Sequence, residues 1–315
     1  METSIWERFL SYQSTQTIQK RLEKHYASND FKNASGLSYD NSYRLIYFLK
    51  HGENFFTQAN QAPHAIQPIL LFYGFSQLLK ACLIIKDPDY PSTSSVLAHG
   101  VSSRKRKKQQ YQFIKDEVKI QRHGLFPHVA EKLFQIKHLD TEKYTMEMLL
   151  RQIAEMNEVF LFHQSKNVLK QVKIKNNNIL IDEETALAFH MSQERLTEYL
   201  CEKYPGKLLK EDNHSLSSIS IKKGFQYNCL PFSFNLEKDT FHIPSSRDFL
   251  ITIPELLVHY LLLYNLSMIS RYETEWWYEL LLGATSDDYP FILRYMEIAK
   301  RKVPYFIFNF LEMNL

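Results

Sequence analysis

Glycine is scarce in this chain, with 8 among 315 residues. Such scarcity argues against a loop-rich all-β protein and against glycine-rich loops that cradle phosphates. The chain also contains no Gly-x-Gly-x-x-Gly, no Walker loop, no Gly-x-Ser-x-Gly and no His-Glu-x-x-His. The common motifs of nucleotide-binding loops, serine hydrolases and zinc hydrolases are therefore missing, and nothing in the sequence declares an enzyme.

Cysteine is equally sparse. Cys82, Cys201 and Cys229 lie far apart and have no metal-ligand spacing, so we predict no metal and no other cofactor. An odd, dispersed set is typical of the reducing cytosol. The first residues also lack the basic and apolar parts of a secretion signal. We therefore expect a cytoplasmic protein.

Long uninterrupted apolar runs are missing as well. Two segments, 66–85 and 256–269, are strongly apolar, but the first contains Lys80 and the second contains His259 and Asn265. A spanning helix needs about 20 mostly apolar residues. We read both segments as buried helices and expect no membrane partner.

Aromatic residues, by contrast, are abundant, with 22 Phe and 19 Tyr. Apolar residues recur at helical spacing along most of the chain. We predict helices over 4–26, 39–51, 63–85 or 68–85, 127–136, 145–162, 183–203, 252–282 and 286–304. The second of these places Tyr39, Tyr43, Ile46 and Tyr47 on one face.

The middle of the chain has the alternating pattern of strands. Val172 and Ile174 are followed by three asparagines and by Ile179 to Ile181, which predicts a hairpin. Alternation returns around Ile219, Phe234 and Ile243. We therefore predict a mainly α (α+β) fold with a small antiparallel β-containing middle segment. Its regions would be 1–170, which is helical and contains a basic segment at 99–123, a β-containing region at 171–250, and C-terminal helices at 251–315 packing on the N-terminal helices.

The net charge of +3 is unevenly distributed. Residues 99–123 hold eight Lys/Arg against two acidic residues, a local charge of +6, so the rest of the chain carries −3. Five of these cations form the run Arg104–Lys108. Such a run is either a solvated surface block or a site that captures phosphates of a nucleotide or nucleic acid. Aromatic residues for base stacking are few here, so nucleic acid is the weaker partner prediction.

Three of the eight glycines follow histidine. His51-Gly52 comes after a helical stripe and predicts a helix end. His99-Gly100 and His123-Gly124 instead bracket the basic segment. Gly124 precedes a predicted helix, whose first amides could bind an anion. The alternative is ordinary turns and capped helix ends.

These features predict one anion-binding site from segments distant in sequence. Its residues would be His99, Gly100, Ser102, Ser103, Arg104, Arg122, His123, Gly124, Ser246 and Arg247, the last two because Ser245-Ser246-Arg247 repeats the triplet Ser102-Ser103-Arg104. We expect a non-enzymatic regulatory or interaction protein that binds an anionic small molecule, a nucleotide, there.

Two alternatives remain open. Arg122 and His128 match the loose Arg-x(4–6)-His pattern of HEPN-type ribonucleases, in which the histidine acts as general acid or base and the arginine stabilises charge on phosphorus. The match is short and frequent by chance. The third reading is a partner-binding scaffold, in which Trp276 and Trp277 would be interface anchors or core residues.

Several segments resemble the YaaC-like family of bacilli. They are Pro68-Ile-Leu-Leu-Phe-Tyr-Gly-Phe-Ser76, the steps His99-Gly100 and His123-Gly124, Met146-Glu-Met-Leu-Leu-Arg151, and His259-Tyr-Leu-Leu-Leu-Tyr-Asn-Leu-Ser267. The resemblance runs along the whole chain. It implies a cytosolic bacterial protein and brings no catalytic residue to this sequence.

Overall fold

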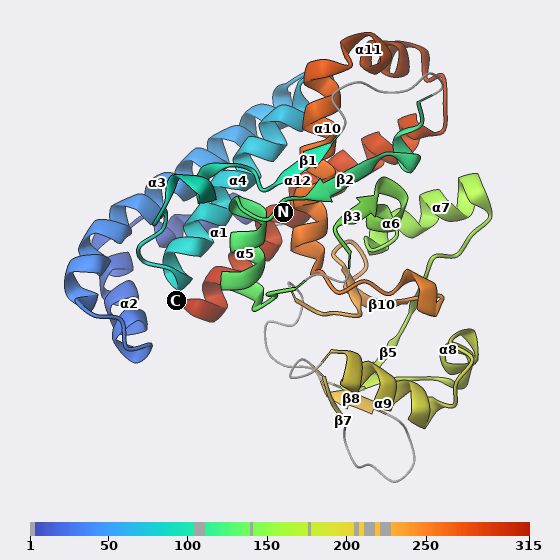
Figure 1. Cartoon of the computed structure of the whole chain (residues 1–315), viewed down its shortest axis with the longest axis horizontal. Helices are drawn as coiled ribbons and strands as arrows, with labels where there is room; N and C mark the ends of the chain where they lie inside the picture. The colour runs from blue at the N-terminus through green and yellow to red at the C-terminus, as the bar shows by residue number, and fades with distance from the viewer. Residues whose placement is uncertain are drawn as a thin grey trace. The chain divides into compact units, whose positions relative to one another are not determined.

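The computed structural model describes residues 4–103, 111–138, 141–175, 178–204, 208–210, 218–220 and 228–315. Helices dominate, and the strands form small antiparallel sheets (Figure 1). The predicted mainly α fold with some β structure is therefore confirmed. The chain divides into two compact units, Met1–Tyr144 with His259–Leu315, and Thr145–Val258. These boundaries differ from the predicted 170/171 and 250/251.

The first unit is built from helices of both chain ends. They are α1 (Ile5–Phe9), α2 (Thr15–Ser28), α3 (Ala34–Gln61), α4 (Gln67–Lys86), α5 (Leu125–Phe134), most of α10 (Glu255–Tyr272), α11 (Thr274–Gly283) and α12 (Asp288–Asn314). Several predicted helices were too long or too short. The predicted 4–26 helix is divided into α1 and α2, and the predicted 252–282 helix into α10 and α11.

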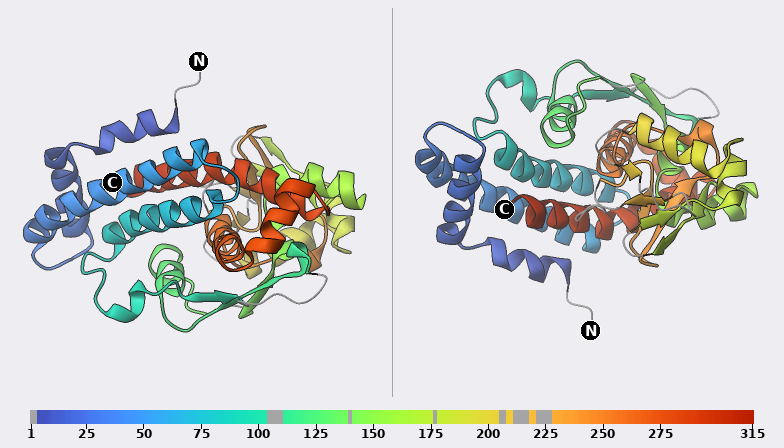
Figure 2. Two further views of the ribbon diagram at one scale, coloured as in Figure 1. Left: turned by 90° about the horizontal axis from the view of Figure 1, so that it is seen from above. Right: turned by 90° about the horizontal axis from the view of Figure 1, so that it is seen from below.

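Helices α3 and α4 lie side by side in Figures 1 and 2. Gly52 and Gly74 make this close approach feasible. A Cβ atom on Gly52 would lie 2.5 Å from Leu78 Cδ2, and one on Gly74 would lie 2.7 Å from Phe55 Cβ. The prediction that His51-Gly52 ends a helix was therefore wrong, because this glycine serves packing in the middle of α3.

The tyrosine face of α3 points toward solvent. Tyr39, Tyr43 and Tyr47 are 55%, 39% and 65% exposed, whereas the opposite face, which includes Leu45, Leu49 and Phe56, is buried. A helical repeat of large aromatic residues thus marks a surface rather than the core in this helix.

Helix α12 packs against α4 and α1, as Figure 2 shows in both views. Its N-terminal residue Asp288 accepts hydrogen bonds from the backbone N–H groups of Phe113 (2.7 Å) and Ile114 (3.2 Å). The helix continues past Pro304 to Asn314, so the predicted end at this proline was wrong. Buried residues such as Phe306 and Phe310 offset the one backbone hydrogen bond that proline removes.

A small sheet that the sequence did not predict has the order β1 (Val101–Ser103), β2 (Glu117–Ile120), β3 (Lys143–Thr145). Strands β1 and β2 are antiparallel, with Val101 opposite Ile120. These strands are three or four residues long, which is too short for a clear alternating pattern. The pairing brings the two ends of the 99–123 segment together.

The second unit contains the predicted β structure. Its elements are α6 (Met146–Leu150), α7 (Asn157–Gln164), β4 (Leu169–Gln171), β5 (Lys173–Lys175), β6 (Asn178–Leu180), α8 (Glu183–Ala188), α9 (Gln193–Lys203), β7 (Leu209–Lys210), β8 (Ser218–Ser220), β9 (Ser233–Asn235) and β10 (Thr240–Pro244). The sheets have the orders β4-β10-β9 and β5-β6-β8-β7. The hairpin is confirmed, since Ile174 pairs with Ile179.

Helix α4 is long and apolar enough to cross a membrane by length and composition, with a mean hydropathy of 1.7 over its most apolar window. Of that window, 72% is buried inside the protein. This burial is the pattern of a core helix and agrees with the reading of 66–85 as a buried helix.

Candidate functional site

The two His-Gly steps that bracket the basic segment meet through their backbones. The N–H of Leu125 donates to Ala98 O (2.7 Å), the N–H of Phe126 donates to His99 O (3.1 Å), and the N–H of Gln121 donates to Gly100 O (2.9 Å). A Cβ atom on Gly124 would lie only 2.3 Å from the Cα of Gly100. The sequence prediction therefore identified a real convergence at this point.

The start of α5 nevertheless offers no amide to an anion. Leu125 and Phe126 donate to the preceding loop, His128 donates to Gly124 O (3.2 Å), and Pro127 has no N–H group. An anion site at a helix N-terminus requires unoccupied N–H groups. The expectation of free amides after Gly124 was wrong, because the backbone itself occupies them.

The imidazole of His99 packs among aromatic rings from α4 and α10. The ring centroid lies 5.0 Å from that of Phe72, 6.1 Å from that of Tyr73 and 5.8 Å from that of Tyr264. The carbonyl of the same residue accepts a hydrogen bond from the Tyr260 hydroxyl (3.0 Å). Its carbonyl oxygen therefore accepts two hydrogen bonds, and its side chain is partly buried.

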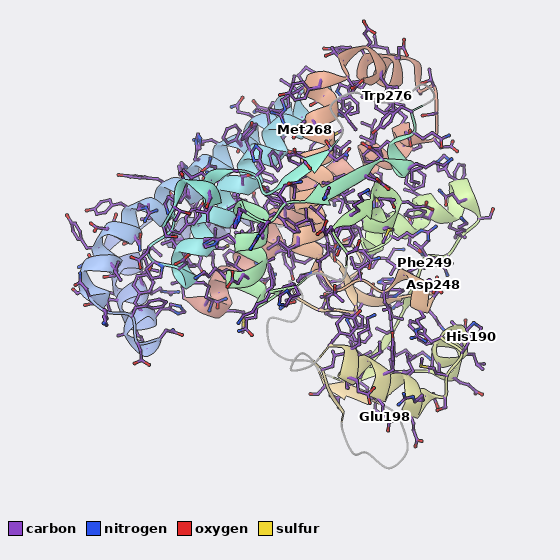
Figure 3. All side chains as sticks on the ribbon, in the orientation of Figure 1. His190, Glu198, Asp248, Phe249, Met268 and Trp276 are labelled. Carbon is purple, nitrogen blue, oxygen red and sulfur yellow. The ribbon has the colours of Figure 1, made fainter. Side chains whose placement is uncertain are left out.

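Two cationic side chains are near enough to this imidazole for their charges to lower its pKa. Arg271, in the last turn of α10, donates from Nε to Ser267 O (2.9 Å) and from Nη1 to the Tyr73 hydroxyl (3.5 Å). One of its Nη groups also contacts the sulfur of Met268, which is labelled in Figure 3, at 3.1 Å. Lys80, on α4, lies over the Phe48 ring at 5.8 Å.

Among the residues that the structure describes, neither Lys80 nor Arg271 has a carboxylate partner, and the His99 side chain forms no hydrogen bond. We call Tyr73, Lys80, His99, Tyr264 and Arg271 the His99 cluster. It contains three basic groups and two phenol hydroxyls, contributed by α4, α10 and the segment before β1.

Burial and positive charge act together on this cluster. The pKa of His99 is lowered from 6.5, first by desolvation and then by the charges of Arg271 and Lys80. Burial also lowers the pKa of Lys80 and raises that of Tyr264, although the nearby Arg271 opposes the latter effect. At neutral pH His99 is therefore an uncharged donor and acceptor beside two cations.

The other predicted residues of the first unit that the structure describes lie in strand β1 or just after strand β2. The hydroxyl of Ser102 accepts a hydrogen bond from Gln121 Nε2 (2.6 Å), and Ser103 pairs with Val118 across the β1–β2 ladder. Arg122 and His123 are exposed. Arg104 and the rest of the run Arg104–Lys108 lie outside the described residues.

Ser246 and Arg247 belong to the second unit. Ser246 caps a short 3-10 helix, accepting a hydrogen bond from the N–H of Asp248 (3.3 Å), a residue labelled in Figure 3. The guanidinium of Arg247 lies 5.0 Å from the centre of the Tyr199 ring. Both residues therefore have local structural partners within their own unit.

The histidine of the ribonuclease hypothesis has a carboxylate partner. His128 Nε2 lies 2.8 Å from Asp87 Oδ2, and its ring stacks on Tyr90 with centroids 5.6 Å apart. Lys132 approaches the same carboxylate at 3.8 Å. Arg122, its proposed companion, is exposed on the loop before α5.

The two tryptophans differ in environment. Trp277 is fully buried and donates from Nε1 to Ala65 O (2.9 Å), so it is a core residue and not a surface anchor. Trp276, labelled in Figure 3, packs edge-on against Tyr111 at 4.7 Å. No group of three or more metal-ligating side chains occurs in the described part of the chain.

Sequence reasoning missed Tyr73, Lys80, Tyr264 and Arg271. One signal was present, because Lys80 is a cation in the middle of a strongly apolar helix, and a charge placed there needs a partner or a function. The other three are ordinary members of helical stripes. Only the packing of α4 against α10 and the 99–100 turn reveals that they share one site.

Residues 10–311 match the YaaC-like protein family, which is nearly the whole length. No curated protein and no solved structure matches. Two of the segments that carried the sequence resemblance, Pro68–Ser76 and His259–Ser267, lie in α4 and α10 and supply Tyr73 and Tyr264 to the His99 cluster. The chain therefore belongs to the YaaC-like protein family.

Proposed function

We propose that this protein is a cytosolic regulatory protein that binds an anionic small molecule, a nucleotide, at the His99 cluster. The observation that carries the proposal is the partly buried pair of cations, Lys80 and Arg271, which have no carboxylate partner among the described residues. Burying like charges together costs free energy, and an anion bound between them offsets that cost.

The neutral form of His99 also favours a ligand with phosphate groups. An uncharged imidazole can donate a hydrogen bond to a phosphate oxygen or accept one from a hydroxyl group, and the phenol of Tyr264 can do the same. Phosphate recognition by arginine and lysine is strong because these hydrogen bonds are charge-assisted. The Tyr73 ring, which lies 6.1 Å from that of His99 and stacks on Phe55, can contact the base of such a ligand.

Binding, rather than catalysis, fits the surroundings of His99. A histidine that transfers protons in an enzyme is usually oriented by a hydrogen-bonded partner. Within the described residues the His99 side chain has none. The site supplies a positive field and hydrogen bonds, which is what recognition of an anion requires.

Thermal-shift measurements with nucleoside mono-, di- and triphosphates test the proposal. Pyrophosphate probes the cations alone, and nucleosides probe the aromatic rings alone. We expect the di- and triphosphates to raise Tm, since a ligand at 100 times its Kd stabilises by about 2.7 kcal/mol. The Lys80→Gln/Arg271→Gln variant should lose this increase.

The matched control is Lys20→Gln/Lys50→Gln, which removes the same charge from exposed positions. It should keep the full increase in Tm. An Arg104→Glu/Arg122→Glu variant measures how much the basic segment contributes to the ligand-induced increase in Tm. A flat response of the wild type across the panel would reject the proposal, and so would stabilisation that survives loss of Lys80 and Arg271.

A second candidate function is metal-independent RNA cleavage by Arg122 and His128. The observation in its favour is Asp87, whose carboxylate holds His128 Nε2 at 2.8 Å and so orients the imidazole. RNA incubated with the pure protein in EDTA should be cleaved by the wild type but not by His128→Ala or Arg122→Ala. No cleavage by the wild type would reject this activity.

A further inference from the structure

Aromatic side chains form a row along α3 that leads to the His99 cluster. Tyr39, Tyr43, Tyr47, His51 and Phe55 follow one another at intervals of four residues. Neighbouring ring centroids are 5.7 Å apart for Tyr39–Tyr43, 6.4 Å for Tyr43–Tyr47 and 4.8 Å for His51–Phe55. We call these five residues the aromatic row.

The aromatic row joins the His99 cluster through direct ring contacts. Phe55 stacks on Tyr73 at 6.4 Å, and the Tyr73 ring lies 6.1 Å from His99. The hydroxyl of Tyr73 also receives a hydrogen bond from Arg271. One end of the row is therefore at the cationic site, and the other end continues over the exposed surface of α3.

The length of the row exceeds that of a mononucleotide. Five residues at four-residue intervals span about 24 Å of helix axis, with about 6 Å between successive rings. Each step also turns by about 40° around the helix, so the row crosses the exposed side of α3 diagonally. A ligand that covers all of it must be a chain of several units.

The exposure of the row points to a partner. Three large aromatic side chains that are 39% to 65% exposed on one helix face leave apolar ring surface in water. Contacts between aromatic residues four positions apart contribute a few tenths of a kcal/mol to a helix. The same exposed rings are stacking platforms of the kind that single-stranded nucleic acid uses.

We propose that the ligand of the His99 cluster is a single-stranded oligonucleotide, whose terminal phosphate sits between Lys80 and Arg271 and whose bases stack along the aromatic row. The inference rests on the proposed anion site and names the class of its ligand. Charge complementarity favours this occupant over a neutral or basic peptide, because the row ends on two cations that lack a carboxylate partner in the described residues. A mononucleotide would leave most of the row uncovered.

Fluorescence anisotropy with labelled oligonucleotides tests the proposal. The probes are 5′-phosphorylated RNA and DNA strands of two, four and eight nucleotides, an eight-base-pair duplex, and an unlabelled mononucleotide as competitor. Affinity should rise from two through four to eight nucleotides, and the eight-nucleotide strand should bind more tightly than the duplex. Comparing the affinities for RNA and DNA strands of equal length shows which of the two nucleic acids the site prefers.

Variants then separate the row from the anion site. Tyr39→Leu/Tyr43→Leu/Tyr47→Leu keeps apolar side chains on the helix but removes the rings. It should weaken eight-nucleotide binding by about tenfold or more, since the stacking of a single base on an aromatic ring already contributes about tenfold in affinity. The affinity for the mononucleotide, measured by competition, should be unchanged in this variant. Tyr278→Leu, which changes an exposed tyrosine on α11, is the control and should bind as the wild type does.

Each other outcome overturns the inference. If oligonucleotides and the mononucleotide bind equally and the triple variant has no effect, the oligonucleotide proposal fails while the nucleotide site stands. If no strand binds, the oligonucleotide proposal fails, and the thermal-shift panel with mononucleotides decides whether the nucleotide site stands. If the wild type forms a dimer that the triple variant loses, and no strand binds, the row is an interface between two copies of this chain.

Discussion

Gly100 and Gly124 are packed so closely that a Cβ atom added to the second would lie 2.3 Å from the Cα and the N of the first. Both have positive φ angles, 76° and 132°, which side-chain-bearing residues rarely adopt. This contact joins the turn before β1 to the start of α5 and holds the backbone of His99 in place. The His99 cluster therefore depends on two residues that have no side chain.

Substitution of Gly124 should be costly. Gly124→Ala adds a methyl group that collides with backbone atoms and requires an unfavourable φ, so the free energy of unfolding should fall by about 2 kcal/mol or more. Urea denaturation measures this change. The control is Gly283→Ala, where the added Cβ meets only the Thr285 side chain, and it should change stability little. Equal stability of the two variants would contradict the close contact.

The buried carboxylate of Asp288 should also be important for stability. It accepts hydrogen bonds from two backbone N–H groups, those of Phe113 and Ile114, and so fixes the segment after Tyr111 to the start of α12. Asp288→Ala leaves both groups unpaired, which should cost about 2 kcal/mol or more. Asp40→Ala, at an exposed position of α3, is the control and should be almost neutral. An Asp288→Ala variant as stable as the wild type would show that other groups hold this segment.

The lowered pKa of His99 predicts a pH dependence of stability. The folded protein disfavours protonation of this imidazole. The contribution of neutral His99 to the free energy of unfolding is therefore fully present above pH 6.5 and is lost as the pH falls below 6.5. His99→Gln should therefore flatten part of the decline in unfolding free energy between pH 6.5 and 5. Lys80→Gln should flatten this decline less, because the charge of Lys80 lowers the pKa of His99 less than burial does.

The comparison of these pH profiles has its own control. Lys50→Gln changes an exposed lysine of α3 and should follow the wild-type curve throughout. A decline of equal steepness in wild type and His99→Gln would mean that His99 does not carry the effect. His25, whose pKa burial also lowers, would then be the next group to replace.

The sequence was informative where a pattern reports a local preference. Alternation predicted the hairpin around residues 176–178, and the helical repeat predicted α4 to within two residues of its C-terminal end. The pairing of the two His-Gly steps was also anticipated from their positions around the basic segment. The signals for the hairpin and for α4 lay in neighbouring residues, whereas the two His-Gly steps are 24 residues apart.

The orientation of α3 and the membership of the His99 cluster depend on tertiary contacts that the periodicity of the sequence does not encode. Periodicity places Tyr39, Tyr43 and Tyr47 on one face but does not say which face of α3 meets α4. That choice comes from Gly52 and Gly74, which allow close packing on the opposite side. In the same way, Arg271 belongs to a site only because the end of α10 lies beside Tyr73 and His99.

The most direct measurement is the NMR signal of the His99 imidazole, assigned by its loss in His99→Gln and followed during titration with a nucleoside diphosphate. An anion bound beside Lys80 and Arg271 should shift this signal in a saturable way and raise the pKa of His99, because the added negative charge opposes the two cations. In Lys80→Gln/Arg271→Gln the signal should no longer respond. A His99 signal that stays constant while the protein binds the nucleotide elsewhere would contradict the assignment of this site.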